Sequence, residues 1–202
     1  MQLPWMSRTD RRHWKSARTT AALGELMAQW LEGSISSRPG YTPRYGPEDE
    51  TRPLVPTLAA LCRAGYVTTC SQPGLVGWGA DDAWWEQRAA VEGVVTDPVL
   101  LHRLVDAATT AGLLVRTIDY SRNAPGEAPI PVTTRNCETA GEFGGRISEA
   151  DMAAQWRGLN PDLHDEVSHG TYVIILAPEY GPTGNRLWRI LAGSVQEVGH
   201  AA

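Results

Sequence analysis

The residues best suited to chemistry lie in one stretch of the first half of the chain, where hydroxyl and amide side chains follow an apolar run. Thr68, Ser71 and Gln72 come directly after Tyr66 and Val67, which have the character of a buried strand. Polar side chains at the end of a strand are a common way to build a small-molecule site on a rigid scaffold. The stretch therefore predicts a ligand site at a strand end.

A second candidate is Gln87, an amide within the apolar segment 84–95. If the segment is a strand, Gln87 shares a face with Trp85 and Val91, and if it is a helix, Gln87 still lies on the apolar stripe. We favour the strand because charged residues alternate with apolar ones. An amide on an apolar face costs about 1–3 kcal/mol unless it is hydrogen bonded. Either a backbone edge or a ligand could satisfy it, and the sequence leaves both open.

Glu50 and Thr51 precede a predicted helix and also allow two interpretations. Structurally, Thr51 is a good N-cap and Glu50 would lie near the positive end of the helix dipole. Functionally, the carboxylate of Glu50 could receive the ammonium group of a ligand. If the protein is an enzyme, Glu50 is the best candidate for a general acid or base.

The sequence offers weaker evidence for a metal site, a catalytic nucleophile or a dinucleotide-binding motif. His164 and His169 lie among acidic residues in a loop-like segment, and we favour a solvated acidic loop over a metal site. Cys70 precedes Ser71, but no base can be assigned to a nucleophile there. Gly141, Gly144 and Gly145 do not form a dinucleotide-binding motif, because they follow no strand-then-helix pattern. We therefore expect no metal.

Composition limits the class of protein. The chain has 202 residues, 42% of them hydrophobic, and a net charge of −5, which gives no electrostatic footprint for nucleic acid. Cys62, Cys70 and Cys137 leave an odd thiol and indicate reduced, intracellular cysteines. No apolar run is long enough to span a membrane, and no signal-peptide pattern is present, so we expect a cytoplasmic protein.

The elements that must position these residues follow from periodicity and turn signals. We expect a flexible basic arm over residues 1–16 and a single mixed α/β domain over 17–202. Helices are predicted from residue 20 to 33, after 51 to 65 and from 97 to 112, each closed by glycine. Strands are predicted over 66–70 and 113–120, and the segment 84–120 reads as a β-α-β unit.

The second half of the chain is less regular. Residues 121–147 are predicted as a long connection with a short strand at 131–134, and Ser148 with Asp151 opens a short helix. The last predicted element is a hairpin-like pair of strands over 171–177 and 186–192, joined by a turn-rich segment.

Several of these motifs together resemble a known family. Residues 68–73 resemble the Leu-Thr-Ile-Asn-Ser-Gln-Pro stretch of the C-terminal regulatory domain of methylenetetrahydrofolate reductase, and the Val-Gly-Trp-Gly of residues 76–79 recurs intact. Residues 50–51 and 87 keep the family spacing. The resemblance covers residues 23–195 and extends to Asn185, Leu187 and Trp188, which resemble the family's final strand. It identifies the chain as similar to that domain in the form of a stand-alone bacterial protein.

The resemblance implies a mixed α/β (α+β) fold with central, largely antiparallel sheets flanked by helices. It also implies binding of S-adenosylmethionine or S-adenosylhomocysteine. The positions that match the family's ligand contacts are Glu50, Thr51, Thr68, Ser71, Gln87 and, in a looser alignment, Thr133. Departures are Cys70 in place of Asn, a shorter loop after residue 73 and a poor match over 135–147.

The flavin-containing catalytic barrel has no counterpart, so neither reductase activity nor flavin is expected. The leading hypothesis is a sensor or regulator that binds S-adenosylmethionine or S-adenosylhomocysteine. The alternative is an enzyme that has recruited the same pocket for an adenosyl or amino-acid metabolite. A third class, an interaction module with a protein partner or a second copy of the chain, is suggested by the eight Trp residues and the basic arm.

Overall fold

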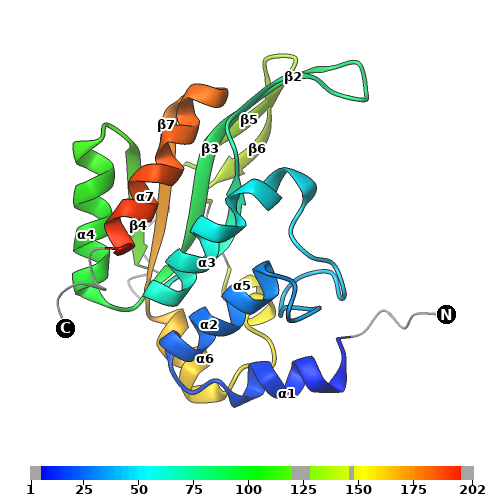
Figure 1. Ribbon diagram of the computed structural model, residues 1–202, viewed down its shortest axis with the longest axis vertical. Helices are drawn as coiled ribbons and strands as arrows, with labels where there is room; N and C mark the ends of the chain where they lie inside the picture. The colour runs from blue at the N-terminus through cyan, green and yellow to red at the C-terminus, as the bar shows by residue number, and fades with distance from the viewer. Residues whose placement is uncertain (1–5, 120–127, 146–147, 197–202) are drawn as a thin grey trace.

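The described chain forms a seven-stranded antiparallel sheet, and its longest strand, β3 (Trp84–Val95), pairs with four of the others. A computed structural model describes residues 6–119, 128–145 and 148–196 (Figure 1). One half of β3 pairs with β1 (Tyr66–Gln72) and β7 (Thr171–Tyr180), and β4 (Leu114–Asp119) lies beyond β7. The other half pairs with β2 (Leu75–Trp78) and β5 (Ile130–Arg135), followed by β6 (Glu138–Phe143). The sheet is not closed, and the predicted mixed α/β fold is confirmed.

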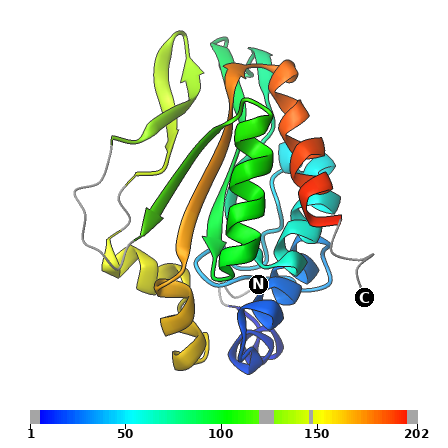
Figure 2. The same ribbon diagram turned by 90° about the vertical axis from the view of Figure 1, so that its left-hand side faces the viewer.

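Helices α3 (Val55–Ala64), α4 (Pro98–Thr110) and α7 (Arg186–Gln196) cover one face of the sheet, and the β5–β6 hairpin extends on the opposite side (Figure 2). Helix α2 (Thr20–Leu31) packs against α3 and contacts both α1 (Arg8–Ser16) and α6 (Pro161–Ser168). The remaining short elements are η1 (Asp49–Leu54), α5 (Glu149–Gln155) and η3 (Pro182–Asn185).

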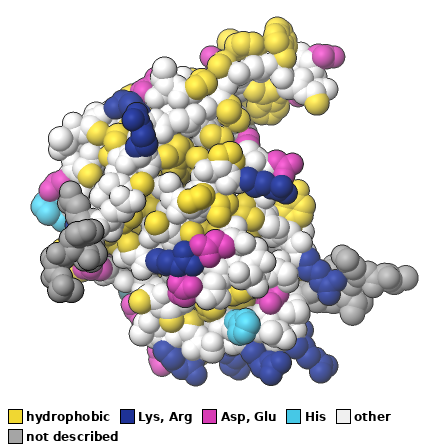
Figure 3. Space-filling model, viewed as in Figure 1, with side chains coloured by type: hydrophobic (Ala, Val, Ile, Leu, Met, Phe, Trp, Pro, Cys, Tyr) yellow, Lys and Arg dark blue, Asp and Glu magenta, His cyan; other side chains and the backbone are white. Residues whose placement is uncertain are grey.

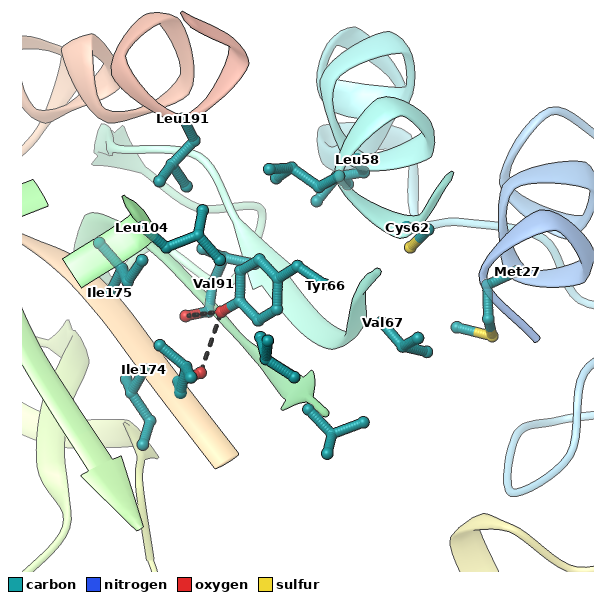
Figure 4. Close-up of a cluster of buried hydrophobic side chains, with 14 of the residues drawn as sticks. Met27, Leu58, Cys62, Tyr66, Val67, Val91, Leu104, Ile174, Ile175 and Leu191 are labelled. Carbon is teal, nitrogen blue, oxygen red and sulfur yellow. Dashed lines mark hydrogen bonds between the residues drawn. The ribbon is translucent and has the colours of Figure 1, made fainter. Parts of the chain in front are cut away.

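The core lies between these three helices and the sheet. Tyr66 of β1 is fully buried there, near Leu58 of α3, Leu104 of α4 and Leu191 of α7 (Figure 4). Its hydroxyl donates to the carbonyl oxygen of Val173 at 2.9 Å and also lies 3.4 Å from that of Val91. The buried phenol is therefore satisfied by backbone acceptors and can serve as core.

Most predicted boundaries are confirmed because caps determine them. Thr19 caps α2 by accepting from the N–H of Ala22, and Asp97 caps α4 by accepting from the N–H of Val99. Gly65, with φ of 104°, ends α3 in the left-handed region that glycine adopts without strain. The predicted strand over 84–95 is confirmed, and Ser148 opens α5 by accepting from the N–H of Asp151.

The predicted β-α-β unit is also found, but a further strand, β7, lies between its two strands. Strands β3 and β4 are both antiparallel to β7, which lies between them. They are therefore parallel to each other and joined by α4, as in a split β-α-β unit. A local pattern can predict the crossover but not the strand that inserts into it.

Four predictions were wrong. Residues 186–192 form α7 rather than a strand, because Leu187, Leu191 and Ser194 are buried at helical spacing. The short strand predicted at 131–134 is confirmed as β5, but the predicted connection around it also contains β6, which makes it a β5–β6 hairpin, and residues 121–127 and 146–147 of that segment lie outside the described residues. His164 lies on α6 instead of in a loop.

The fourth concerns the predicted basic arm. Residues 8–16 form α1, capped by Ser7, and Trp14 on this helix is buried with its indole N–H donating to the carbonyl of Ser37 at 2.8 Å. The positive charges of α1 face solvent, at the lower edge of the molecule in Figure 3. One buried indole thus anchors a helix whose other residues have the composition of a flexible segment.

Two features of the surface complete the fold. The strand β2 and the turn after it extend from the body with Leu75, Val76 and Trp78 exposed, and hydrophobic side chains gather there in Figure 3. Over the described ranges, none of the helices has the length and apolar character needed to cross a membrane.

Candidate functional site

The structure brings the first part of the predicted ligand set together at η1 and β1. Glu50 and Thr51 lie in η1, which contacts β1, the strand that holds Thr68 and Ser71. The carboxylate of Glu50 is close enough to contribute to raising the pKa of Cys70. In the described part of the chain, neither the Glu50 nor the Ser71 side chain has a hydrogen-bond partner. Both polar groups therefore remain available to a ligand.

The side chains of Thr51 and Thr68 are less accessible to a ligand. Thr68 is buried, and its hydroxyl lies 3.3 Å from the thiol of Cys62 on α3. Thr51 is buried within η1 and is not the N-cap of α3, which begins after Leu54 without a side-chain cap. Pro53 lies within η1, and because proline has no N–H the chain forms a short 3-10 turn before the regular helix starts. The predicted capping role of Thr51 is thus wrong.

The second part of the predicted set lies further along the sheet. Gln87 of β3 and Thr133 of β5 are directly opposite each other in the strand register. Ser71 is paired with Val91, four residues along β3 from Gln87. The structure therefore divides the predicted ligand set into a β1–η1 group and a β3–β5 group.

A structural amide lies between the two groups, but it is Gln72 rather than Gln87. The Gln72 amide donates to the carbonyls of Arg88 and Val132, both at 3.0 Å, and accepts from the hydroxyl of Thr133 at 3.1 Å. Gln87 is half-buried, and its side chain makes no hydrogen bond with another described residue. The sequence left open whether Gln87 is hydrogen bonded by the backbone or by a ligand. In the structure, it is Gln72 that hydrogen bonds to the backbone.

A pocket of about 340 Å³ lies next to the bulged part of β1, and none of the predicted ligand residues lines it. Its walls are the loop after α2, the middle of β1, the sheet and α5. The lining residues are Arg38, Gly40, Thr69, Cys70, Glu92, Asp151, Ala154, Gln155 and Tyr172. Its volume is at the lower end of the range for small-molecule sites, which suits a metabolite.

A β-bulge in β1 shapes this pocket. The pairing with β3 slips between Thr68 and Cys70, so that Thr69 has no register partner and Cys70 lies opposite Glu92. The Thr69 hydroxyl lies 2.8 Å from the hydroxyl of Tyr172 and 3.2 Å from the carbonyl of Glu92. Bulges commonly redirect side chains in this way next to functional sites. The bulge lies between Thr68 and Ser71, two members of the predicted set.

Burial raises the pKa of two groups in the pocket, Glu92 and Cys70. Burial raises the pKa of Glu92, although hydrogen bonds from the N–H of Gly144, at 3.1 Å, and from Tyr172 oppose the shift. Cys70 reaches solvent on one side, but neighbouring protein atoms desolvate it on the others. This desolvation, with the charge of Glu92, raises the pKa of Cys70 to about 11. Cys70 is therefore a thiol near neutral pH and a poor nucleophile.

The sequence analysis did not identify the pocket residues Arg38 and Glu92, because only the tertiary structure brings them together. Arg38 lies in a loop without periodicity, and Glu92 lies on the face of β3 that the sequence assigned to its charged residues. The alternation on β3 indicates two faces but does not reveal that α5 and the loop after α2 cover part of the second face.

The described residues contain no group of three or more His, Cys, Asp or Glu side chains arranged to hold a metal ion. His164 lies 3.5 Å from the hydroxyl of Ser168, and His169 forms an exposed pair with Asp165 at 3.3 Å. The two histidines therefore have ordinary helix-surface partners.

A family model described as "Domain of unknown function (DUF6919)" matches residues 9–198. The chain belongs to the DUF6919 family. A comparison with curated proteins finds no match. Membership of DUF6919 covers every element of the site above, from α1 to α7, and does not by itself connect the chain to methylenetetrahydrofolate reductase.

Proposed function

We propose that this DUF6919 chain is a stand-alone small-molecule-binding domain that takes S-adenosylmethionine or S-adenosylhomocysteine and acts as a sensor or regulator. The observation that carries the proposal is the end of β1. There, two polar side chains without partners in the described structure, Glu50 and Ser71, lie next to a β-bulge. The bulge residues Thr69 and Cys70, but not Glu50 or Ser71 themselves, line a 340 Å³ pocket.

The chemistry of these residues suits such a ligand. A carboxylate such as Glu50 can pair with the ammonium group of the ligand's amino-acid part. The Ser71 hydroxyl can donate or accept, and Gln87 offers an amide of the kind that pairs with a purine edge. Because Glu50 is exposed and Ser71 is half-buried, a ligand can reach them without unfolding an element.

The test is calorimetry with S-adenosylmethionine and S-adenosylhomocysteine on the wild-type protein and on Glu50→Gln. Losing one charge-assisted hydrogen bond costs about 1.5–3 kcal/mol, so the variant should bind about 10- to 100-fold more weakly. Glu142→Gln is the matched control, because Glu142 is an exposed carboxylate on β6. It should keep the wild-type affinity.

Gln87→Ala should also lose affinity while the free energy of unfolding stays close to that of the wild type. The absence of both binding heat and thermal stabilisation at millimolar concentrations of either ligand would overturn the proposed function. Equal loss of affinity in Glu50→Gln and Glu142→Gln would remove Glu50 from the site.

A further inference from the structure

Arg38 is held at the edge of the pocket in an unusual way. Its guanidinium carbon lies 4.7 Å from the ring centroid of Trp30 and also 4.7 Å from that of Tyr41. Among its N–H donors, only Nη2 has a partner within the described structure, the carbonyl of Thr69 at 3.1 Å. The Nε atom is buried and has none. The ring contacts fix the plane of the guanidinium and leave Nη1 free to bind.

No carboxylate of the described residues forms an ion pair with Arg38. A cation that is partly removed from water without a counter-ion is unfavourable, and burial accordingly lowers the pKa of Arg38. Contacts with aromatic faces offset part of this cost. An anionic group of a ligand would offset the rest, and a planar guanidinium is best matched by a carboxylate.

The rest of the lining is compatible with an anion. The hydroxyls of Tyr172 and Thr69, which hydrogen bond to each other, lie in the same pocket, and burial raises the pKa of Glu92. The other lining carboxylate, Asp151, is exposed and accepts from the hydroxyl of Ser148 at 2.7 Å. A ligand carboxylate could therefore pair with Arg38 without displacing an ion pair of the described residues.

From this geometry we infer that Arg38 binds the carboxylate of a small organic acid in the pocket between the loop after α2, the β1 bulge and α5. This inference deepens the proposed function and rests on it for the identity of the ligand: the carboxylate is then that of the methionyl part. The amino-acid end of the ligand lies at Arg38, with its ammonium group toward Glu50.

The experiment uses two pairs of probes that differ only in the carboxylate. S-adenosylmethionine is compared with decarboxylated S-adenosylmethionine by calorimetry, and L-methionine with methioninamide by ligand-observed NMR. Each pair is measured on the wild-type protein, on Arg38→Met and on Arg157→Met. The methionine side chain keeps most of the apolar stem of Arg38. Arg157 is an exposed arginine two residues after the end of α5 and does not line the pocket, so its replacement removes the same charge outside the pocket.

We expect the wild type and Arg157→Met to prefer the carboxylate member of each pair by about tenfold or more, and Arg38→Met to lose this preference. If Arg38→Met does not fold, Arg38→Lys is used, which keeps the charge but not the planar fork and should weaken the preference. Equal binding of both members of each pair to the wild type would overturn the inference while the proposed function stands. So would a preference that persists in Arg38→Met.

The two proposals can fail separately. If neither adenosyl ligand binds but L-methionine is preferred over methioninamide in an Arg38-dependent manner, the carboxylate site is supported and the proposed function fails. If no carboxylate probe binds at about 10 mM, which corresponds to less than about 3 kcal/mol of affinity, the carboxylate site is refuted.

Discussion

Two amides on neighbouring strands show how strongly context decides the role of a residue. Gln72 makes three hydrogen bonds that join β1, β3 and β5, whereas the Gln87 side chain has no partner among the described residues. The sequence drew attention to Gln87 because its neighbours are apolar. Gln72 makes the structural hydrogen bonds because β5 lies within reach of its side chain, and no local sequence pattern predicts the position of β5.

Substituting each glutamine by methionine should therefore give different stabilities. Gln72→Met leaves the carbonyls of Arg88 and Val132 and the hydroxyl of Thr133 without the amide, which should lower the free energy of unfolding by about 1–3 kcal/mol. Gln87→Met should stay within about 0.5 kcal/mol of the wild type. Urea unfolding of the two variants measures both values. A larger loss for Gln87→Met would show that Gln87 is structural and would remove it from the ligand site.

Glu92 gives a prediction about pH. Because burial raises its pKa above the ordinary value of 4.5, the folded state holds a proton that the unfolded state releases. The contribution of Glu92 to stability is therefore full below pH 4.5 and falls as the pH rises through the raised pKa. The charged and titratable groups that line the same pocket are Arg38, Cys70, Asp151 and Tyr172.

Glu92→Gln keeps an oxygen that can accept from the N–H of Gly144 but cannot ionise. We expect its free energy of unfolding to decline less between pH 4.5 and pH 8 than that of the wild type. Glu142→Gln, on the exposed side of β6, should follow the wild-type profile. Urea titrations at a series of pH values give the slopes. Identical slopes for Glu92→Gln and the wild type would show that Glu92 titrates as an ordinary exposed carboxylate.

At the scale of elements, the closest helix contact is between α2 and α3. A Cβ atom built on Gly24 of α2 would lie 2.0 Å from the carbonyl oxygen of Cys62 on α3, which is far inside contact distance. Glycine at this helical position is therefore required by packing. Gly193 of α7 provides the contrast, because nothing lies within 4 Å of its Cβ position.

Gly24→Ala should destabilise the protein although alanine favours helices. The gain in helix propensity is about 1 kcal/mol, whereas forcing α2 and α3 apart should cost about 1–3 kcal/mol or more. Gly193→Ala should instead stabilise by about 0.5–1 kcal/mol, because only the propensity changes. Thermal and urea unfolding compare the two variants. A stabilised Gly24→Ala protein would mean that α2 and α3 do not approach as closely as described.

The elements also show what a sequence can and cannot specify. Thr19 at the start of α2, Asp97 at the start of α4 and Gly65 at the end of α3 act on the adjacent backbone, so these helix ends were predictable. Segment 186–192 was mistaken for a strand because its apolar residues fit a period of 2 nearly as well as 3.6 over so short a span. The pocket was not predictable, since Arg38, Glu92 and Tyr172 come from three distant segments that meet only when the sheet and α5 are in place.

At the scale of the molecule, β3 organises both halves of the candidate site. Its second half pairs with β1 beside the pocket, and its first half pairs with β5 beside Gln87 and Thr133. Gln87 shares a face of β3 with Val91, whereas Glu92 and the pocket lie on the other face. A ligand that contacts both Arg38 and Gln87 would therefore have to reach around the edge of the sheet at β1, with its adenosyl and amino-acid ends on opposite faces.

A crystal structure of the protein with S-adenosylhomocysteine tests this account most directly. We predict electron density beside the β1 bulge, with the ligand carboxylate within hydrogen-bond distance of Arg38 Nη1 and its ammonium group facing Glu50. Density for the ligand anywhere else on the molecule, or an empty β1–η1 site at saturating ligand, would contradict the account.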